Sequence, residues 1–201
     1  MKNQIIACID GSRSATAVCL WSAWAASRLE APLKLLHVLE KSALPATADL
    51  SGSIGLGSRE DLMDELLRLD EQRSRIANEQ GKHLLSAAKE RVLNHAETEP
   101  ARYEIKTCQR HGSLVENLID LENDTRLIIM GRQGEVSSQL SQVGSQLENV
   151  VRVLHTPVLV SVGDFNVPQK IMFAYDGSET GQKALERLTI SPLFKGVSCV
   201  L

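Results

Sequence analysis

Short apolar runs alternate with longer helical segments along most of the chain, and this alternation limits the possible folds more than any other feature. Strands that are separated by helices pair in parallel, and the helices then cover both faces of the sheet. Runs such as "IIACI" and "RLIIM" carry little or no charge in their centres, which is typical of strands buried on both sides. The five expected strands are residues 5–9, 33–39, 102–108, 126–130 and 157–162, and the expected helices are residues 15–29, 59–95, 113–123 and a segment from about 145. The sequence therefore predicts an α/β fold, an open five-stranded parallel sheet with helices on both faces.

After this unit the chain repeats its own beginning. The stretch "IIACIDGSRSATAVCL" at residues 5–20 resembles "IMFAYDGSETGQKALE" at residues 171–186, and both predict a strand, an Asp-Gly-Ser turn and a helix. Such a turn can also arise independently, because Asp and Ser cap a helix and Gly turns the chain. Its position directly after a complete unit favours a true repeat. We expect a first domain at residues 1–162, a linker at 163–169 and the start of a second, truncated domain at 170–201.

Composition argues against several functional classes. The net charge of −3 and the lack of a Lys/Arg cluster speak against nucleic-acid binding. The four cysteines form no C-x-x-C pair, so we expect reduced thiols and neither a zinc site nor a disulfide framework. The N-terminal apolar run is too short for a signal peptide, and no stretch has the length and apolarity needed to cross a bilayer. A cytoplasmic protein without membrane association is the expectation.

The loop after the fourth expected strand carries the clearest functional signal. Residues 131–147 are "GRQGEVSSQLSQVGSQL", with glycines at Gly131, Gly134 and Gly144 and a serine at Ser145. Glycine lets the backbone approach a ligand closely, and successive N–H groups form a concavity that binds anions. The following helix begins here, and helix N-termini also attract anions. In open parallel sheets, ligands bind beyond the carboxyl ends of the strands. The loop therefore suits a polyphosphate, although it is neither a Walker A loop nor a G-x-G-x-x-G turn.

The spacing G-x2-G-x9-G-[S/T] resembles the nucleotide motif of the universal stress protein family, in the subset that binds ATP. The resemblance covers the whole first unit, including "DGS" after the first strand and "HVL" at the end of the second. Residues 170–201 resemble the start of another such domain, so the chain looks like a tandem member with an incomplete second domain. The resemblance implies a stress-response regulator that binds ATP, with Mg²⁺, and acts on a protein partner that the sequence does not identify.

The same resemblance assigns positions around the nucleoside. Asp10 would sit beside the adenine and ribose, and Val38 would line the adenine pocket with its backbone groups. Met130 and Gly131 would lie under the ribose. Two alternatives remain open on the residues alone, since Asp10 also suits a turn cap and Val38 also suits the core.

The phosphates would be held by Gly134, Gly144 and Ser145. The chain departs from the family pattern nearby. Gln146 and Leu147 follow the Gly-Ser pair, where the family often has a small or hydroxyl residue. Glu135 would repel a phosphate unless it turned outward or a metal bridged it, whereas Arg132 could offset that charge.

No catalytic constellation accompanies the motif. There is no nucleophile elbow and no Ser/His/Asp order, and the histidines lack metal-ligand spacing. We therefore expect a binding protein with at most slow ATP hydrolysis. ATP-cleaving ligases of related architecture typically carry "SGG-x-D-S" after the first strand, where this chain has "DGSRS". The main alternative is a nucleotide-free interaction module of the same fold, and in either case we expect a homodimer through the final strand, residues 157–162.

Overall fold

A computed structural model describes residues 3–40, 56–95, 103–132 and 144–200, with the side chains of the long central helix described from Met63 onward. The main sheet has five parallel strands in the order β3-β2-β1-β4-β5, which confirms the predicted fold class. Its strands are β1 (Gln4–Cys8), β2 (Leu33–Leu39), β3 (Ile105–His111), β4 (Thr125–Gly131) and β5 (Val158–Ser161). The order reverses between β1 and β4, so their carboxyl ends mark the edge where a ligand cleft is expected.

The third strand is displaced from its predicted position. Residues 102–108 were expected, whereas β3 begins at Ile105 and continues through Gln109 and Arg110 to His111. β3 is an edge strand, and polar groups of Gln109 and Arg110 donate hydrogen bonds to the helices beside it. Gln109 Nε2 donates to Asn78 Oδ1 at 3.1 Å. The residues that were expected in a loop therefore extend the strand.

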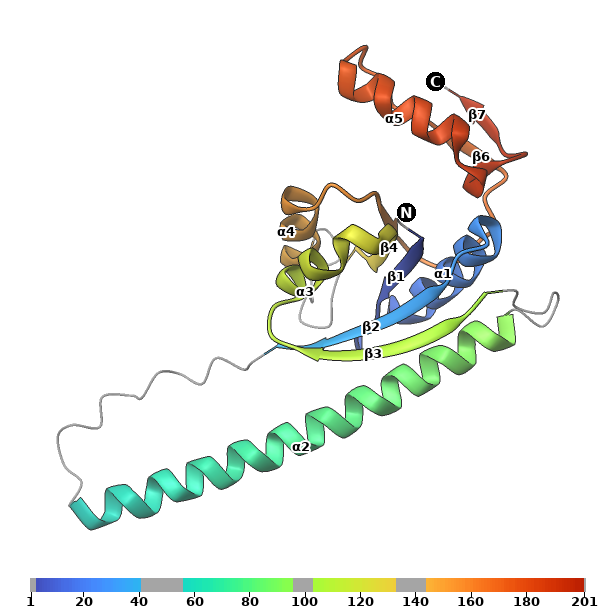
Figure 1. Cartoon of the computed structure of the whole chain (residues 1–201). Helices are drawn as coiled ribbons and strands as arrows, with labels where there is room; N and C mark the ends of the chain where they lie inside the picture. Colours follow the sequence, from blue (N-terminus) through green and yellow to red (C-terminus); the bar gives the residue numbers. More distant parts are fainter. Residues whose placement is uncertain (1–2, 41–55, 96–102, 133–143, 201) are drawn as a thin grey trace.

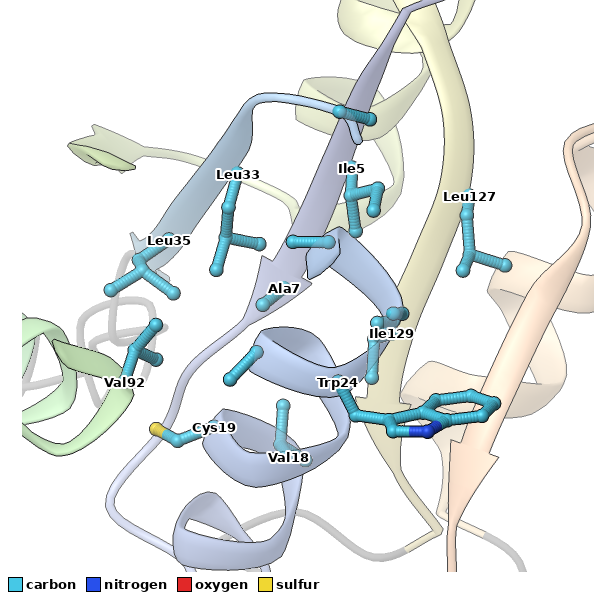
Figure 2. Close-up of a cluster of buried hydrophobic side chains, with 14 of the residues drawn as sticks. Ile5, Ala7, Val18, Cys19, Trp24, Leu33, Leu35, Val92, Leu127 and Ile129 are labelled. Atoms are coloured by element: carbon cyan, nitrogen blue, oxygen red, sulfur yellow. The ribbon is translucent and has the colours of Figure 1, made fainter. Parts of the chain in front are cut away.

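Helices cover both faces of the sheet (Figure 1). One layer contains α1 (Ala15–Leu29) and α2 (Leu56–His95), and the other contains α3 (Leu114–Leu121), the short 3₁₀ turn η2 (Glu122–Asp124) and α4 (Ser145–Val153). Alternate strand residues serve the two layers, as the period of two requires. Ile5 and Ile129 pack toward α1 and α2 (Figure 2), whereas Ile6 and Ile128 pack toward α3 and α4.

The long helix α2 packs on the sheet only through its C-terminal half. Its buried positions there are Gly81, Leu85, Ala88 and Val92, which recur at helical spacing. Figure 1 shows the helix continuing beyond the sheet, where large apolar side chains such as Leu67 are 61% exposed. Gly81 makes a close approach to the strands. A Cβ atom at this position would lie 2.8 Å from His37 Cδ2 and 3.0 Å from Gln109 Cδ.

The C-terminal segment forms a second, smaller unit. It consists of β6 (Lys170–Met172), α5 (Glu179–Ile190), the 3₁₀ turn η3 (Pro192–Phe194) and β7 (Ser198–Val200), and β6 pairs with β7 in parallel. It contacts the first unit through η3. Leu193 is buried in the same core as α1, the Phe194 ring lies 5.9 Å from that of Trp24, and Arg28 Nη1 donates to the Lys195 carbonyl at 2.8 Å. None of the described helices combines the length and apolar character needed to span a membrane.

Candidate functional site

A cleft of about 710 Å³ opens at the carboxyl edge of the main sheet. It lies between the ends of β1, β2 and β4, the first turn of α4 and the middle of α2. Six of the seven predicted site residues line it, and they come from four separate parts of the chain: Asp10, Val38, Met130, Gly131, Gly144 and Ser145. The seventh, Gly134, lies outside the described residues, as does Glu135. The fold thus brings residues that are far apart in the sequence to one cavity.

Asp10 follows β1 and holds the turn that leads into α1. Its Oδ1 accepts hydrogen bonds from the Ser12 backbone N–H at 3.1 Å and from Ser12 Oγ at 2.5 Å. The Ser12 hydroxyl also lies 2.9 Å from Ser14 Oγ. Asp10 therefore has the turn-capping role that the sequence left open. Asp10 also lines the cleft, so it can serve both as a turn cap and as a site residue.

The end of β2 forms another wall of the cleft. Val38 is half-buried and faces the α3–α4 core, so it combines a packing role with a place on the cavity. The preceding residue, His37, lies on the opposite face of the strand. Its Nδ1 is 2.8 Å from the Ile9 carbonyl and must donate, because a carbonyl oxygen only accepts. This hydrogen bond fixes the imidazole at the base of the cleft, against Gly81 of α2.

The two ends of the glycine loop are joined by backbone hydrogen bonds. The Gly144 N–H donates to the Arg132 carbonyl at 2.9 Å, and the Arg132 N–H donates to the Ser161 carbonyl of β5 at 3.0 Å. Met130, 5% exposed, and Gly131 line the cleft just before this junction. The loop therefore leaves and re-enters the fold at one point on the carboxyl edge of β4.

Helix α4 begins at that junction with its first turn directed along the cleft wall. Gly144 is its N-cap, in an extended conformation (φ −62°, ψ 137°), and gives no side-chain cap. The first intrahelical backbone bond is the one from the Glu148 N–H to the Gly144 carbonyl, at 3.1 Å. No acceptor among the described residues serves the N–H groups of Ser145, Gln146 and Leu147. Unpaired N–H groups at a helix N-terminus are the usual donors to a bound anion.

Several residues that line the cleft were not predicted as site residues, among them His37, Glu40 and Gly81. Glu40 follows β2, and its Oε1 accepts a hydrogen bond from Gln146 Nε2. Gly81 comes from α2, a helix that was expected at residues 59–95 but was given no part in the site. A glycine within an otherwise strong helical pattern was the available signal, since it costs helix stability unless something packs closely against it.

Cys8 lies on the wall of the cleft beside Asp10. Burial raises the pKa of the Cys8 thiol to about 12, and the negative charge of Asp10 adds to the rise. The thiolate is the nucleophilic form of cysteine, so this thiol is a weak nucleophile at neutral pH. Among the described residues, no group of three or more His, Cys, Asp or Glu side chains could hold a metal ion.

Iodoacetamide at pH 8 is therefore expected to alkylate the exposed Cys199 long before Cys8. With a pKa of about 12, only about one Cys8 in ten thousand is a thiolate at pH 8, and the fraction rises about a hundredfold by pH 10. Peptide mass spectrometry after timed quenching gives both rates, and the urea-unfolded chain serves as the control in which the difference disappears. Equal alkylation rates for Cys8 and Cys199 in the folded chain at pH 8 would contradict the prediction.

Comparison with known proteins shows which family has this architecture. Residues 1–161 match the family model described as the universal stress protein family. The universal stress protein Slr1230 of Synechocystis sp. is 36% identical over 196 residues, which cover 96% of this chain and 66% of that protein. A solved universal stress protein from Archaeoglobus fulgidus covers 98% of this chain with a TM-score of 0.64 and 18% identity, and this chain covers 64% of it. A universal stress protein solved in complex with cAMP covers 80% of this chain, with 96% of its own length matched, a TM-score of 0.50 and 17% identity.

Proposed function

Because this chain belongs to the universal stress protein family, we propose that its cleft binds ATP and that the bound nucleotide regulates a stress-response partner. The observation that carries the proposal is the convergence of six predicted site residues, three of them from the glycine motif, on one cavity at the carboxyl edge of the sheet. Its volume of about 710 Å³ lies within the range of roughly 300–1,000 Å³ typical of small-molecule sites. The solved relative that holds cAMP supports an adenine nucleotide as the ligand class.

The nucleoside would occupy the part of the cleft nearest the strands. Asp10 would lie beside the adenine and ribose, with the backbone of Val38 along the adenine edge. Met130 and Gly131, at the end of β4, would support the ribose from below. Half-buried apolar walls and a few polar groups are what such a site requires.

The phosphates would extend toward the first turn of α4. Gly144 offers no side chain to block their approach, and the Ser145 hydroxyl adds a donor to the N–H groups of that turn. Gly134 would complete the cradle from the loop. Mg²⁺ would enter with ATP, held chiefly by phosphate oxygens and water, as is usual for this ion. We propose binding with at most slow hydrolysis.

The test is to denature the purified protein, separate the supernatant by anion exchange and quantify the released nucleotide. About one ATP per chain is expected, together with a rise in the unfolding temperature when Mg-ATP is added to protein stripped of nucleotide. A ligand present at 1,000 times its Kd stabilises the folded state by about 4 kcal/mol. The absence of nucleotide and of any thermal shift at millimolar Mg-ATP would contradict the proposal.

The outer edge of β5 favours a second candidate function, that of a dimerisation module. β5 is the last strand of the sheet, and Val160 and Val162 at its end are 36% and 60% exposed. An exposed apolar edge strand is a ready pairing surface. We propose that residues 157–162 pair with the same segment of a second chain in the cytoplasm. Light scattering with and without ATP would separate a nucleotide-dependent dimer from one that needs no nucleotide.

We also propose that residues 170–201 begin a second domain of the same family, joined to residues 1–162 by residues 163–169. The parallel pairing of β6 with β7 across α5 repeats that of β1 with β2 across α1. The turns match as well. Asp176 Oδ1 accepts from the Ser178 N–H at 2.9 Å, as Asp10 Oδ1 accepts from the Ser12 N–H at 3.1 Å. Hydrogen bonding to Ser178, first from its side chain and second from its backbone N–H, lowers the pKa of Asp176.

A further inference from the structure

A side-chain hydrogen bond joins two walls of the cleft. Gln146 Nε2, in the first turn of α4, donates to Glu40 Oε1, at the end of β2, although the two residues are 106 positions apart in the sequence. Both side chains line the same cavity as Gly144 and Ser145. The carboxylate of Glu40 is thereby held at the end of the cleft where α4 begins.

The N-terminus of α4 is a favourable place for a negative charge. The aligned peptide dipoles place partial positive charge there, and the first-turn N–H groups have no acceptor among the described residues. An anionic ligand would be attracted to the α4 N-terminus by the same dipole and the same N–H groups. Glu40 therefore competes with a phosphate for the α4 N-terminus, and a ligand with more phosphate charge meets more repulsion from it.

We propose that Glu40, positioned by Gln146, moderates the affinity of the cleft for polyphosphates, ATP included, so that each added phosphate strengthens binding less than the α4 N-terminus alone would allow. The proposal rests on the proposed function, since it concerns the phosphate end of the same nucleotide site. It also gives a role to Gln146, which replaces the small or hydroxyl residue expected after the Gly-Ser pair. The Gln146 amide holds the Glu40 carboxylate in place, and this role is separate from any contact that Gln146 makes with the ligand.

The decisive variant is Glu40→Gln, which keeps the size of the side chain and removes its charge. Glu104→Gln is the matched control, because Glu104 lies before β3 at the opposite end of the sheet and its loss changes the net charge equally. Titration calorimetry with inorganic tripolyphosphate probes the phosphate end without a base. Glu40→Gln is expected to bind tripolyphosphate about fivefold more tightly than wild type, the scale of one exposed charge interaction, whereas Glu104→Gln is expected to match wild type.

Adenosine and ATP complete the experiment. Glu40→Gln is expected to leave the Kd for adenosine unchanged and to lower the Kd for ATP, and Gln146→Ala, which leaves the charge but removes its anchor, is expected to give a smaller gain. Tripolyphosphate binding that is equal in Glu40→Gln and Glu104→Gln, or undetectable in both, would overturn the proposal. Failure of adenosine and ATP to bind any variant would contradict the nucleotide function, while the tripolyphosphate comparison would still decide the role of Glu40.

Discussion

Valine in place of Gly144 is expected to weaken ATP binding at least 100-fold while leaving the fold intact. Gly144 is buried at the N-cap of α4, and its φ of −62° and ψ of 137° are allowed for valine. The branched side chain would occupy the space through which a phosphate reaches the first-turn N–H groups. Losing one or two hydrogen bonds to a charged group costs about 1.5–3 kcal/mol each, and about 2.7 kcal/mol corresponds to 100-fold in Kd.

Calorimetry on nucleotide-free protein measures this loss, and the unfolding temperature without ligand checks that the valine is tolerated. Gly144→Ala provides a graded comparison, because its single methyl group should cost less than the valine. A Kd for ATP that is unchanged in a folded Gly144→Val variant would show that the α4 N-terminus does not hold the phosphates. The glycines would then be explained by turn chemistry alone.

Gly81→Val is expected to lower the free energy of unfolding by about 3 kcal/mol, through overpacking between α2 and the sheet. Valine has the better helix propensity, which favours it by a few tenths of a kcal/mol. The contact opposes this gain, because the Cβ alone would lie 2.8 Å from His37 Cδ2 and 3.0 Å from Gln109 Cδ. His37 cannot simply turn away, since its Nδ1 is held by the Ile9 carbonyl. Steric strain therefore outweighs propensity.

Urea unfolding monitored by circular dichroism measures the effect at Gly81. Ala87→Val is the matched control, since it places the same β-branched residue on the exposed face of the same helix and costs only about 0.6 kcal/mol of propensity. If Gly81→Val were as stable as Ala87→Val, the close packing of α2 on β2 and β3 would be wrong. Because His37 lines the cleft, the Gly81 variant should also bind ATP more weakly.

The fold class followed from the sequence because a doubly covered parallel sheet leaves a strong pattern. Central strands such as β1 and β4 are buried on both faces and consist of continuous apolar runs. The edge strand β3 does not obey this rule. Its last residues, Gln109 to His111, are polar and partnered by side chains such as Asn78 and Asn117, so their strand conformation depends on tertiary contacts. The order of the strands likewise depends on packing rather than on local pattern.

The candidate site was predicted where its residues follow local rules and was missed where they do not. Glycines and a serine at a strand-to-helix junction indicate an anion site from spacing alone. Glu40 gives no such signal, because its role depends on meeting Gln146 from a distant part of the chain. Gly81 becomes informative only once α2 is placed against His37. Contacts of this kind form only in the tertiary fold, so no periodic pattern in the sequence reveals them.

The joint between the two units contains both tryptophans of the chain. The ring of Trp21 lies 5.0 Å from that of Phe165, which follows β5, and Trp24 lies against Phe194 of η3. The two indoles are themselves 5.4 Å apart, edge to face. Intrinsic fluorescence therefore reports on this joint more than on any other region. A shift of residues 165–194 relative to α1 would change the tryptophan emission. The position of the second unit relative to the first can therefore be followed by fluorescence, with no added label.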